Sequence, residues 1–240
     1  MTLQRGSTNA ERNSLIDIST RISSRSPTIW KNLTLLRNQM WGHLPHTDEI
    51  FEFFDRVGEH VGEVNSILEF GTNMCYSATV QLEVFKNATI HTYDPRTWGV
   101  LADLWRWPEP RPIENMFFNK KMNWVDLAKL VYGERFQFYK QSSIDAISMH
   151  DKGDFDYAFV DGNHGYEMAK TDIVTCLQLE IPWILVDNTK VIVEVAQAIK
   201  EFPHLELVDE IEYTQHYPFS DEIKPETMSL YKSNYEQFLL

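Results

Sequence analysis

Residues 67–78, which read ILEFGTNMCYSA, decide the fold class of this 240-residue chain. An apolar run ends in Glu-Phe-Gly and a helical pattern begins near Ser77, so the stretch predicts a strand, a tight turn and a helix. Gly71 stands in the turn, where glycine permits a positive φ and lets a ligand approach the backbone closely. The second and third glycines of the dinucleotide-binding fingerprint are missing, which argues against a nicotinamide-dependent oxidoreductase.

The alternation of strand and helix continues along the rest of the chain. Further strands are expected at ATIHTYDP, RFQFYKQS, FDYAFVDG and PWILVDN, with helices between them. ELVDEIEYT and TMSLYKS are two final strands that can pair antiparallel. Alternating strands and helices predict a mostly parallel sheet with helices on both faces. The expected fold is therefore α/β: a Rossmann-like, doubly wound, mostly parallel seven-stranded sheet with a final antiparallel strand.

The N-terminal part of the chain has a different pattern. Residues 1 to about 26 are rich in Ser, Thr, Asn and Arg and predict a loose arm. Two amphipathic helices are expected after it, at 27–40 and 49–61. We expect an N-terminal arm and helical extension over 1–62 and a Rossmann-like domain over 63–240. The extension is a candidate surface for a homodimer.

Composition limits the classes of partner. The 22 Lys and Arg against 35 Asp and Glu give a net charge of −13, which would repel a phosphate backbone, so no nucleic-acid partner is expected. No apolar run approaches the roughly 18 residues of a membrane span, and the first residues lack the apolar core of a signal peptide. Cys75 and Cys176 form neither a disulfide framework nor a zinc cluster. These features favour a cytoplasmic protein that acts on a small molecule and does not contact a membrane.

The predicted strands end in polar residues or glycine. In a doubly wound sheet, ligands bind beyond the carboxyl ends of the strands, where the strand order switches. Asp94 ends the second strand, where a carboxylate can accept hydrogen bonds from both ribose hydroxyls of a nucleotide. The other strand-end residues are Glu69, Gly71, Ser142, Ser143, Asp161, Asp187 and Asn188.

At this point the chain resembles a known family. The segment ILEFGTNMCYSA is similar to the first motif of class I S-adenosylmethionine-dependent methyltransferases, E-x-G-x-x-x-G, and the likeness extends over roughly residues 65–235. The resemblance implies that Glu69, Gly71, Thr72 and Asn73 lie along the methionine and ribose part of the cofactor, that Asp94 holds the ribose, and that Ser143 and Ile144 flank the adenine. It also adds Ser77 and Asp161 to the cofactor-binding set. Cys75 departs from the family, because it occupies the position of the last glycine, where a side chain would crowd the cofactor.

The ends of the fourth and fifth predicted strands suggest a metal site. Asp161, Asp187 and Asn188 would meet there, and two carboxylates with an amide oxygen suit Mg²⁺ or another hard divalent cation. The pattern resembles that of metal-dependent catechol-type and sugar O-methyltransferases. His164 follows Asp161 by three positions, where the catechol-type enzymes carry a lysine base, and DGNHGY resembles the D-G-x-H-x-Y segment of the macrolide-sugar and cephalosporin-tailoring enzymes. An imidazole, whose ordinary pKa is about 6.5, can serve as the base, so Asp161 and His164 are the candidate catalytic residues.

Structural roles remain open for the same residues. Asp161 and Asp187 can cap turns, His164 can bond within its own loop, and Asp172 is more often a solvated or capping carboxylate than a ligand. In the long segment after the second strand, the tryptophans are either walls of an acceptor pocket or core residues that pin the extension to the sheet. These are Trp98, Trp105 and Trp107.

The sequence thus favours an S-adenosylmethionine-dependent methyltransferase that acts on an oxygen of a small molecule, assisted by Mg²⁺ and a histidine base. The acceptor is expected to be a small molecule of unspecified type. The alternative is a degenerate methyltransferase-fold protein that binds a ligand or a partner without catalysis, and Cys75 is the feature that supports it. Retention of polar residues at each strand end favours the enzyme.

Overall fold

The computed structural model describes residues 47–72, 75–96, 124–216 and 223–234. Within these ranges seven strands form one sheet in the order β3-β2-β1-β4-β5-β7-β6. The strands are β1 (Ser66–Phe70), β2 (Thr89–Tyr93), β3 (Phe136–Tyr139), β4 (Tyr157–Val160), β5 (Trp183–Asp187), β6 (Leu205–His216) and β7 (Ile223–Ser233). β1 to β5 pair in parallel, whereas β7 runs antiparallel to both of its neighbours. The predicted mostly parallel seven-stranded sheet with one antiparallel strand is confirmed.

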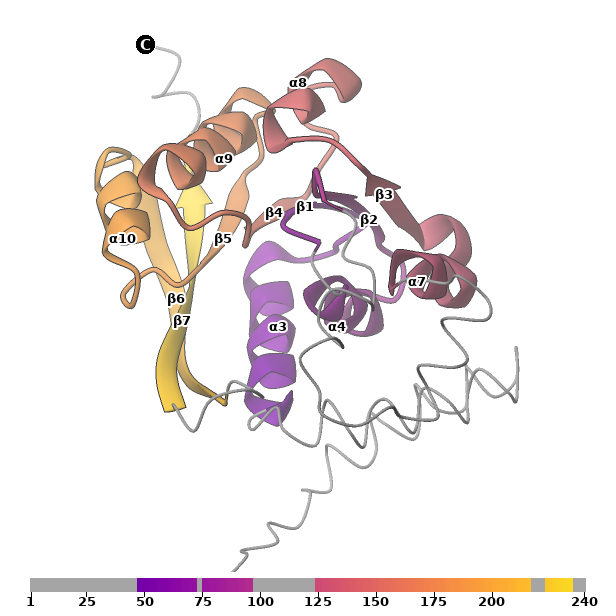
Figure 1. Ribbon diagram of the computed structural model, residues 1–240, viewed down its shortest axis with the longest axis horizontal. Helices are drawn as coiled ribbons and strands as arrows, with labels where there is room; N and C mark the ends of the chain where they lie inside the picture. Colours follow the sequence, from indigo (N-terminus) through magenta and orange to yellow (C-terminus); the bar gives the residue numbers. More distant parts are fainter. Residues whose placement is uncertain (1–46, 73–74, 97–123, 217–222, 235–240) are drawn as a thin grey trace, which may run out of the picture.

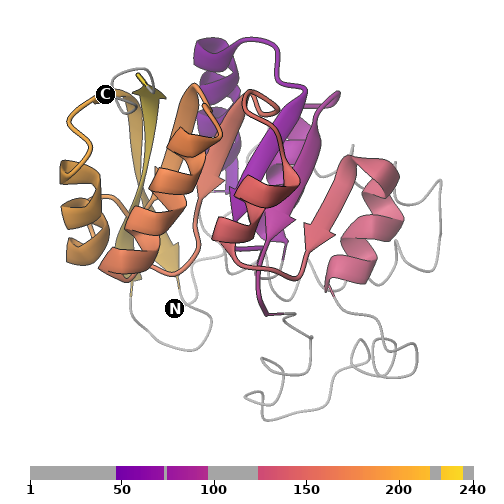
Figure 2. The same cartoon turned by 90° about the horizontal axis from the view of Figure 1, so that it is seen from above.

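Helices cover both faces of the sheet, as Figure 1 shows. One face carries α3 (Thr47–Val61), α4 (Tyr76–Val84) and α7 (Trp124–Tyr132). The other carries α8 (Ala146–Met149), α9 (Tyr166–Gln178) and α10 (Val193–Lys200). Figure 2, seen from above, looks onto the sheet, with the orange helices α9 and α10 in front of the strands and the indigo helix α3 behind them. Two short 3₁₀ turns, η2 (Gly133–Arg135) and η3 (Ser143–Asp145), flank β3.

Each face of the sheet has its own apolar core because side chains alternate along a strand. Ile67 and Ile90 pack toward α3, α4 and α7, whereas Leu68 and Val160 pack toward α9 and α10. β1, β4 and β5 are buried on nearly every residue, which is typical of central parallel strands.

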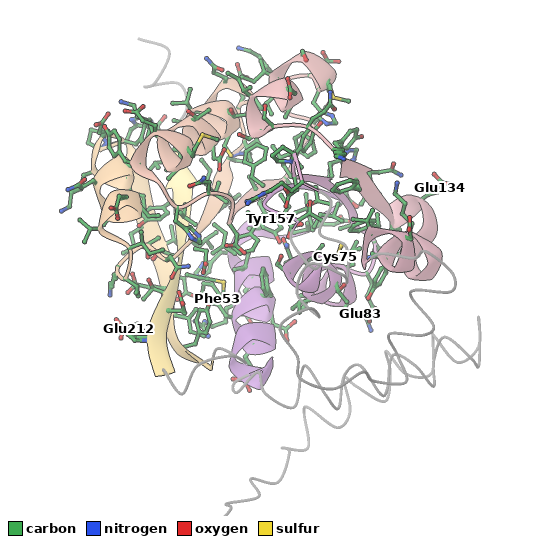
Figure 3. All side chains as sticks on the ribbon, viewed as in Figure 1. Phe53, Cys75, Glu83, Glu134, Tyr157 and Glu212 are labelled. Atoms are coloured by element: carbon green, nitrogen blue, oxygen red, sulfur yellow. The ribbon has the colours of Figure 1, made fainter. Side chains whose placement is uncertain are left out.

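α3 belongs to the predicted N-terminal extension but packs into the same core as the sheet. Its side chains Phe53, Phe54 and Val57 are almost fully buried, and Figure 3 shows Phe53 against the sheet. Arg56 binds Asp209 of β6 with its Nε 2.9 Å from Oδ2. The predicted arm at 1–26, the helix at 27–40 and the three tryptophans after β2 lie outside the described residues.

The β6–β7 hairpin is longer than the parallel strands. β5 ends at Asp187, which pairs with Met228 of β7, whereas β6 continues to His216. The overhang carries the cross-strand pair Tyr213 and Glu226 beyond the carboxyl end of β5. The sequence predicted the two strands but placed the first one only at 206–214, so the extent of this overhang was not anticipated.

Candidate active site at the carboxyl ends of the strands

Gly71 forms the turn after β1 and can be replaced by no other residue without strain. Its φ is +100°, and a Cβ built on it would lie 1.9 Å from the carbonyl oxygen of Asp161. Its backbone N donates to the carbonyl oxygen of Tyr93 at 2.9 Å. The turn is therefore wedged between the ends of β2 and β4, and only a hydrogen fits there.

The side chain of Glu69 is completely buried beneath this turn and has several hydrogen-bond donors. Oε1 accepts from Ser77 Oγ at 2.7 Å and from Gln81 Nε2 at 3.0 Å. Oε2 accepts from Thr92 Oγ1 at 2.5 Å, and Tyr157 donates its hydroxyl to Gln81. Burial raises the pKa of Glu69 to about 7, although these donors partly offset the effect. The carboxylate thus braces β1, β2 and α4 together.

The remaining residues of the first motif are held by the same network. Thr72 is buried, and its Oγ1 lies 2.6 Å from Thr92 Oγ1. Ser77, in the first turn of α4, donates its hydroxyl hydrogen bond to Glu69. Asn73 lies outside the described residues.

Cys75 adopts the backbone conformation of the glycine that it replaces. Its φ is +61° and ψ is 21°, in the left-handed region, and it precedes the first residue of α4. Only 2% of the residue is exposed and it belongs to the apolar cluster under α4, where Figure 3 labels it. Burial, followed by the charges of Glu69 and Asp94, raises the pKa of the thiol. The Cys75 side chain therefore packs in the core, and its effect on cofactor binding stays a prediction.

Asp94 ends β2 beside the first turn and is 4% exposed. Its Oδ1 accepts a hydrogen bond from the backbone N of Arg96 at 2.8 Å, and its own N donates to Tyr139 at 3.1 Å. The carboxylate is thus fixed at the edge where the resemblance puts the ribose.

Ser143 and Ile144 stand in η3, directly after β3. Ser143 is buried, whereas Ile144 is 56% exposed, which suits a side chain that would lie along a flat apolar ring. The Ser143 hydroxyl bonds to Asp172 of α9, whose Oδ2 would lie 2.9 Å from a Cβ built on Gly162. Burial raises the pKa of Asp172 to about 7. The sequence favoured a solvated or capping carboxylate at Asp172; at 3% exposure the solvated role is wrong, and the carboxylate joins α9 to η3 beside Gly162.

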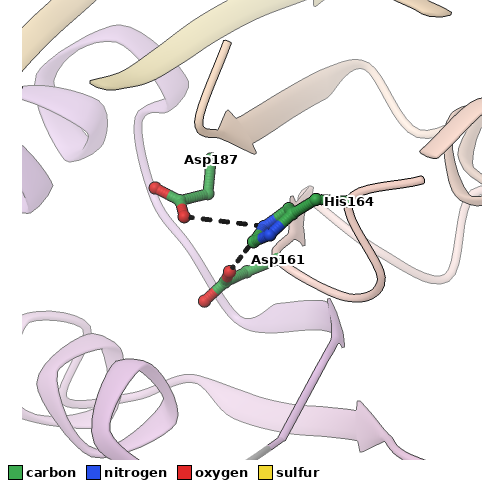
Figure 4. Close-up of side chains that lie close together, drawn as sticks. All are labelled: Asp161, His164 and Asp187. Carbon is green, nitrogen blue, oxygen red and sulfur yellow. Dashed lines mark ion pairs between the residues drawn. The ribbon is translucent and has the colours of Figure 1, made fainter. Parts of the chain in front are cut away.

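Asp161, His164 and Asp187 converge at the ends of β4 and β5, as Figure 4 shows. His164 Nε2 lies 3.4 Å from Asp161 Oδ1 and 3.8 Å from Asp187 Oδ2. One possible ligand atom from each residue lies within 4.8 Å of the others, which is close enough to share a metal ion. Asp187 is the last residue of β5 and Asp161 directly follows β4, the strand paired with β5, so the sheet itself brings the two carboxylates together.

The carboxylates of Asp161 and Asp187 repel each other when both are ionised. Burial, then the charges of Asp161 and Glu226, raises the pKa of Asp187 well above its usual range, while His164 acts in the opposite direction. Burial also raises the pKa of Asp161, with Glu69 and Glu226 adding to the effect and a hydrogen bond with Asp187 opposing it. The Asp161 side chain is 31% exposed and the Asp187 side chain is 9% exposed, so burial has the stronger effect on the pKa of Asp187. A cation would relieve this repulsion.

Asn188 follows Asp187 directly and is hydrogen-bonded to it. Its φ is +61°, its backbone N bonds to Thr227, and its Nδ2 donates to Asp187 Oδ2. The residue is 6% exposed, and its Oδ1 is buried without a hydrogen-bond partner in the described ranges. The structure thus gathers His164 with the two aspartates, while the predicted third ligand presents an unused oxygen next to them.

Two residues of the overhanging hairpin reach the same place and were missed by the sequence analysis. Tyr213 donates its hydroxyl to Asp187 Oδ1 at 3.2 Å, and Glu226 is 3% exposed and acts electrostatically on both aspartates. No motif marks either residue. Only the register of β6 on β7 and the length of the overhang bring them here.

A family model described as a methyltransferase domain matches residues 68–188, which is half of the chain. The chain belongs to the methyltransferase-domain family. The matched range of this methyltransferase begins in β1 and ends at Asn188, so it spans the candidate cofactor turn and both candidate metal-binding aspartates.

Solved structures agree with the fold. Cofactor-bound Rv0187 from MTB has a TM-score of 0.51 and 13% identity, over 96% of this chain and 100% of that chain. An O-methyltransferase from Bacillus cereus in complex with SAH has a TM-score of 0.49 and 14% identity, over 90% and 97% of the two chains. At 13% identity, the similarity to cofactor-bound Rv0187 shows the fold alone. A search of curated proteins gives no match.

The resemblance stated from the sequence is therefore confirmed at the level of family and fold. The protein has the class I S-adenosylmethionine-dependent methyltransferase fold. Among the helices in the described ranges, none is long and apolar enough to cross a membrane.

Proposed function

We propose that this methyltransferase transfers the methyl group of S-adenosylmethionine to an oxygen atom of a small molecule, with a divalent cation such as Mg²⁺ and His164 as general base. One observation carries the proposal: His164 Nε2 lies 3.4 Å and 3.8 Å from carboxylate oxygens of Asp161 and Asp187. A neutral hydroxyl is a weak nucleophile, so an acceptor hydroxyl must lose its proton to attack the methyl group. A base beside two potential cation ligands can remove that proton.

The cofactor would lie along the ends of β1, β2 and β3. Supporting positions are the wedged turn at Gly71, the carboxylate of Asp94, and the buried Ser143 beside the exposed Ile144. S-adenosylmethionine, when bound, supplies an electrophilic methyl group on a positively charged sulfur. Because Gly71 packs on the backbone of Asp161, the methyl donor and the acceptor site would be neighbours, and this proximity accounts for much of the rate enhancement.

The donor set fits a divalent cation. Asp161 and Asp187 offer carboxylate oxygens, Asn188 offers a buried oxygen without a partner in the described ranges, and no Lys or Arg ion pair neutralises the two aspartates there. Carboxylate and amide oxygens are the ligands that Mg²⁺ prefers. A cation held by them would bind the acceptor oxygen and lower the pKa of its hydroxyl.

His164 would complete the reaction. Its Nε2 takes the proton of the acceptor hydroxyl while the oxygen forms a bond to the methyl carbon, and the carbon–sulfur bond breaks with its electron pair left on sulfur. Nε2 is buried and makes no hydrogen bond within the described ranges, so it is available to accept this proton. The family match gives no support to the alternative of a non-catalytic binding protein.

The first experiment is a calorimetric titration of the full chain with S-adenosylmethionine and with S-adenosylhomocysteine. We expect micromolar binding of both, weakened about tenfold or more by Asp94→Ala, which removes hydrogen bonds to the ribose. Asp156→Ala is the matched control, because Asp156 caps the opposite end of β1 through the backbone N of Asn65 and of Ser66. If neither ligand binds the wild type, the assignment fails.

The second experiment measures methyl transfer to a panel of catechols, sugars and other hydroxylated small molecules, with Mg²⁺ and with excess chelator. We expect activity that needs the cation and that falls at least about 100-fold in His164→Gln with unchanged cofactor affinity. Equal activity in chelator would reject the cation, and a fully active His164→Gln would reject the base.

A further inference from the structure

The β6–β7 hairpin brings a tyrosine to the acceptor site from outside the family match, which ends at Asn188. Asp187, the last residue of β5, pairs with Met228, and Met228 pairs on its other side with Ile211. Two residues farther along the hairpin, Tyr213 pairs with Glu226. Since residues two apart in a strand share a face, Tyr213 lies on the same face as the Asp187 side chain.

The contacts of Asp187 are divided between its two oxygens. Oδ1 accepts the hydroxyl of Tyr213 at 3.2 Å. Oδ2 accepts from Asn188 Nδ2 and lies 3.8 Å from His164 Nε2. The hydroxyl of Tyr213 thus fixes which oxygen faces His164 and the space shared with Asp161.

Packing holds the Tyr213 side chain in place as a hydrogen-bond donor to Asp187. Its ring packs against the apolar cluster beneath α3 and α4, which limits its motion. A phenol ordinarily carries its proton at neutral pH, so the hydroxyl of Tyr213 is the donor to Asp187 Oδ1.

We propose that Tyr213 is a positioning residue of the acceptor site: its hydrogen bond to Asp187 Oδ1 orients that carboxylate for a divalent cation shared with Asp161. This inference rests on the proposed function, because it presupposes that a cation binds there. Residues that orient a metal ligand in this way typically contribute a factor of 10 to 100 to metal affinity.

The test is the affinity of the full chain for Mn²⁺, used as the probe and followed by calorimetry and by the loss of the free Mn²⁺ electron paramagnetic resonance signal. The variant is Tyr213→Phe, which deletes one oxygen and keeps the ring, so the fold should survive. Tyr231→Phe is the matched control, because it removes a hydroxyl from another buried tyrosine, on β7 in the opposite core cluster.

We expect Tyr213→Phe to weaken Mn²⁺ binding about tenfold, while Tyr231→Phe stays within twofold of the wild type and the melting temperatures of both variants remain close together. Wild-type affinity in Tyr213→Phe, or an equal loss in both variants, would overturn the inference and leave the proposed function standing. If the wild type binds no Mn²⁺, both this inference and the role of a cation in the proposed function fail. Methyl transfer measured in excess chelator would then show whether the protein transfers methyl groups without a cation.

Discussion

The two halves of the site treat buried carboxylates in opposite ways. At the ends of β1 and β2, Glu69 is fully buried but receives hydrogen bonds from three side chains. At the ends of β4 and β5, His164 lies between Asp161 and Asp187. Two buried atoms there, His164 Nε2 and Asn188 Oδ1, have no hydrogen-bond partner in the described ranges.

The contrast distinguishes a carboxylate that braces the fold from carboxylates that belong to a candidate binding site. A buried carboxylate is stable when donors surround it, and such a group contributes rigidity. Two buried carboxylates that face each other are costly, and proteins retain such arrangements where a cation or a proton transfer requires them. The first half holds the turn in shape, and the second half is where we propose that a cation and the acceptor bind.

The largest expected effect is at Gly71, where the two halves touch. Gly71→Ala would force a Cβ to within 1.9 Å of the Asp161 carbonyl oxygen at a φ of +100°. We expect a loss of roughly 3–5 kcal/mol in the free energy of unfolding, measured by urea denaturation. Gly153→Ala is the control, because its φ is +81° but nothing lies within 4 Å of the added Cβ, and it should lose only about 1 kcal/mol. Equal losses would show that backbone conformation alone, and not contact between the halves, makes Gly71 necessary.

Asp187→Asn should separate binding from stability in the second half. We expect Mn²⁺ affinity to fall at least about 100-fold and methyl transfer to fall with it, while binding of S-adenosylhomocysteine is retained. Stability at pH 8 should rise by about 1 kcal/mol, because the repulsion with Asp161 disappears. The amide of Asn188 can turn over to meet the new NH₂ group, since its Oδ1 is without a partner in the described ranges. A destabilised variant with normal Mn²⁺ binding would make Asp187 a brace like Glu69.

Glu69→Gln should alter the pH dependence of stability. The pKa of Glu69 is about 7 in the folded protein, above its value in the unfolded chain, so between about pH 4.5 and 7 the folded state binds more protons than the unfolded state. The contribution of Glu69 is therefore fully present below about pH 4.5 and is lost as the pH rises to about 7, by roughly 3 kcal/mol in total.

The glutamine variant lacks this titration, so the difference in unfolding free energy between wild type and variant should narrow or reverse as the pH rises from 5 to 8. Chemical denaturation at each pH measures it. A difference that is constant over this range would mean that the donors around Glu69 hold its pKa near the ordinary value.

The smallest effect is expected at Cys75. Cys75→Gly relieves a left-handed backbone that costs a non-glycine residue about 1 kcal/mol, but it loses a buried side chain of similar value, so stability should change by less than about 1 kcal/mol. Cys75→Ala keeps the strain and loses the sulfur, and should be the less stable of the two. Affinity for S-adenosylmethionine should change less than about threefold. A tenfold gain in Cys75→Gly would show that the thiol crowds the cofactor after all.

Sequence reasoning was strongest where one local segment contains the whole signal. The strand, turn and helix around Gly71 could be predicted from 67–78 because the turn conformation depends on the residues within it. The same reasoning failed for Asp172, because periodicity shows that a residue lies in a helix but not which neighbours cover it. Tyr213 was missed because a tyrosine in a strand carries no mark of the residue it will face.

By itself the sequence determined the order of strands and helices, the position of the glycine turn, and the strand-end aspartates that a parallel sheet must gather at one edge. These follow from local backbone preferences and from the alternation of apolar residues. The packing of distant segments determined that Glu69 is a buried brace, that His164 stands between Asp161 and Asp187, and that Tyr213 and Glu226 lie beside them. Those outcomes depend on strand register, on the overhang of the hairpin and on which donors fill each buried space, and these quantities are fixed when distant segments pack together.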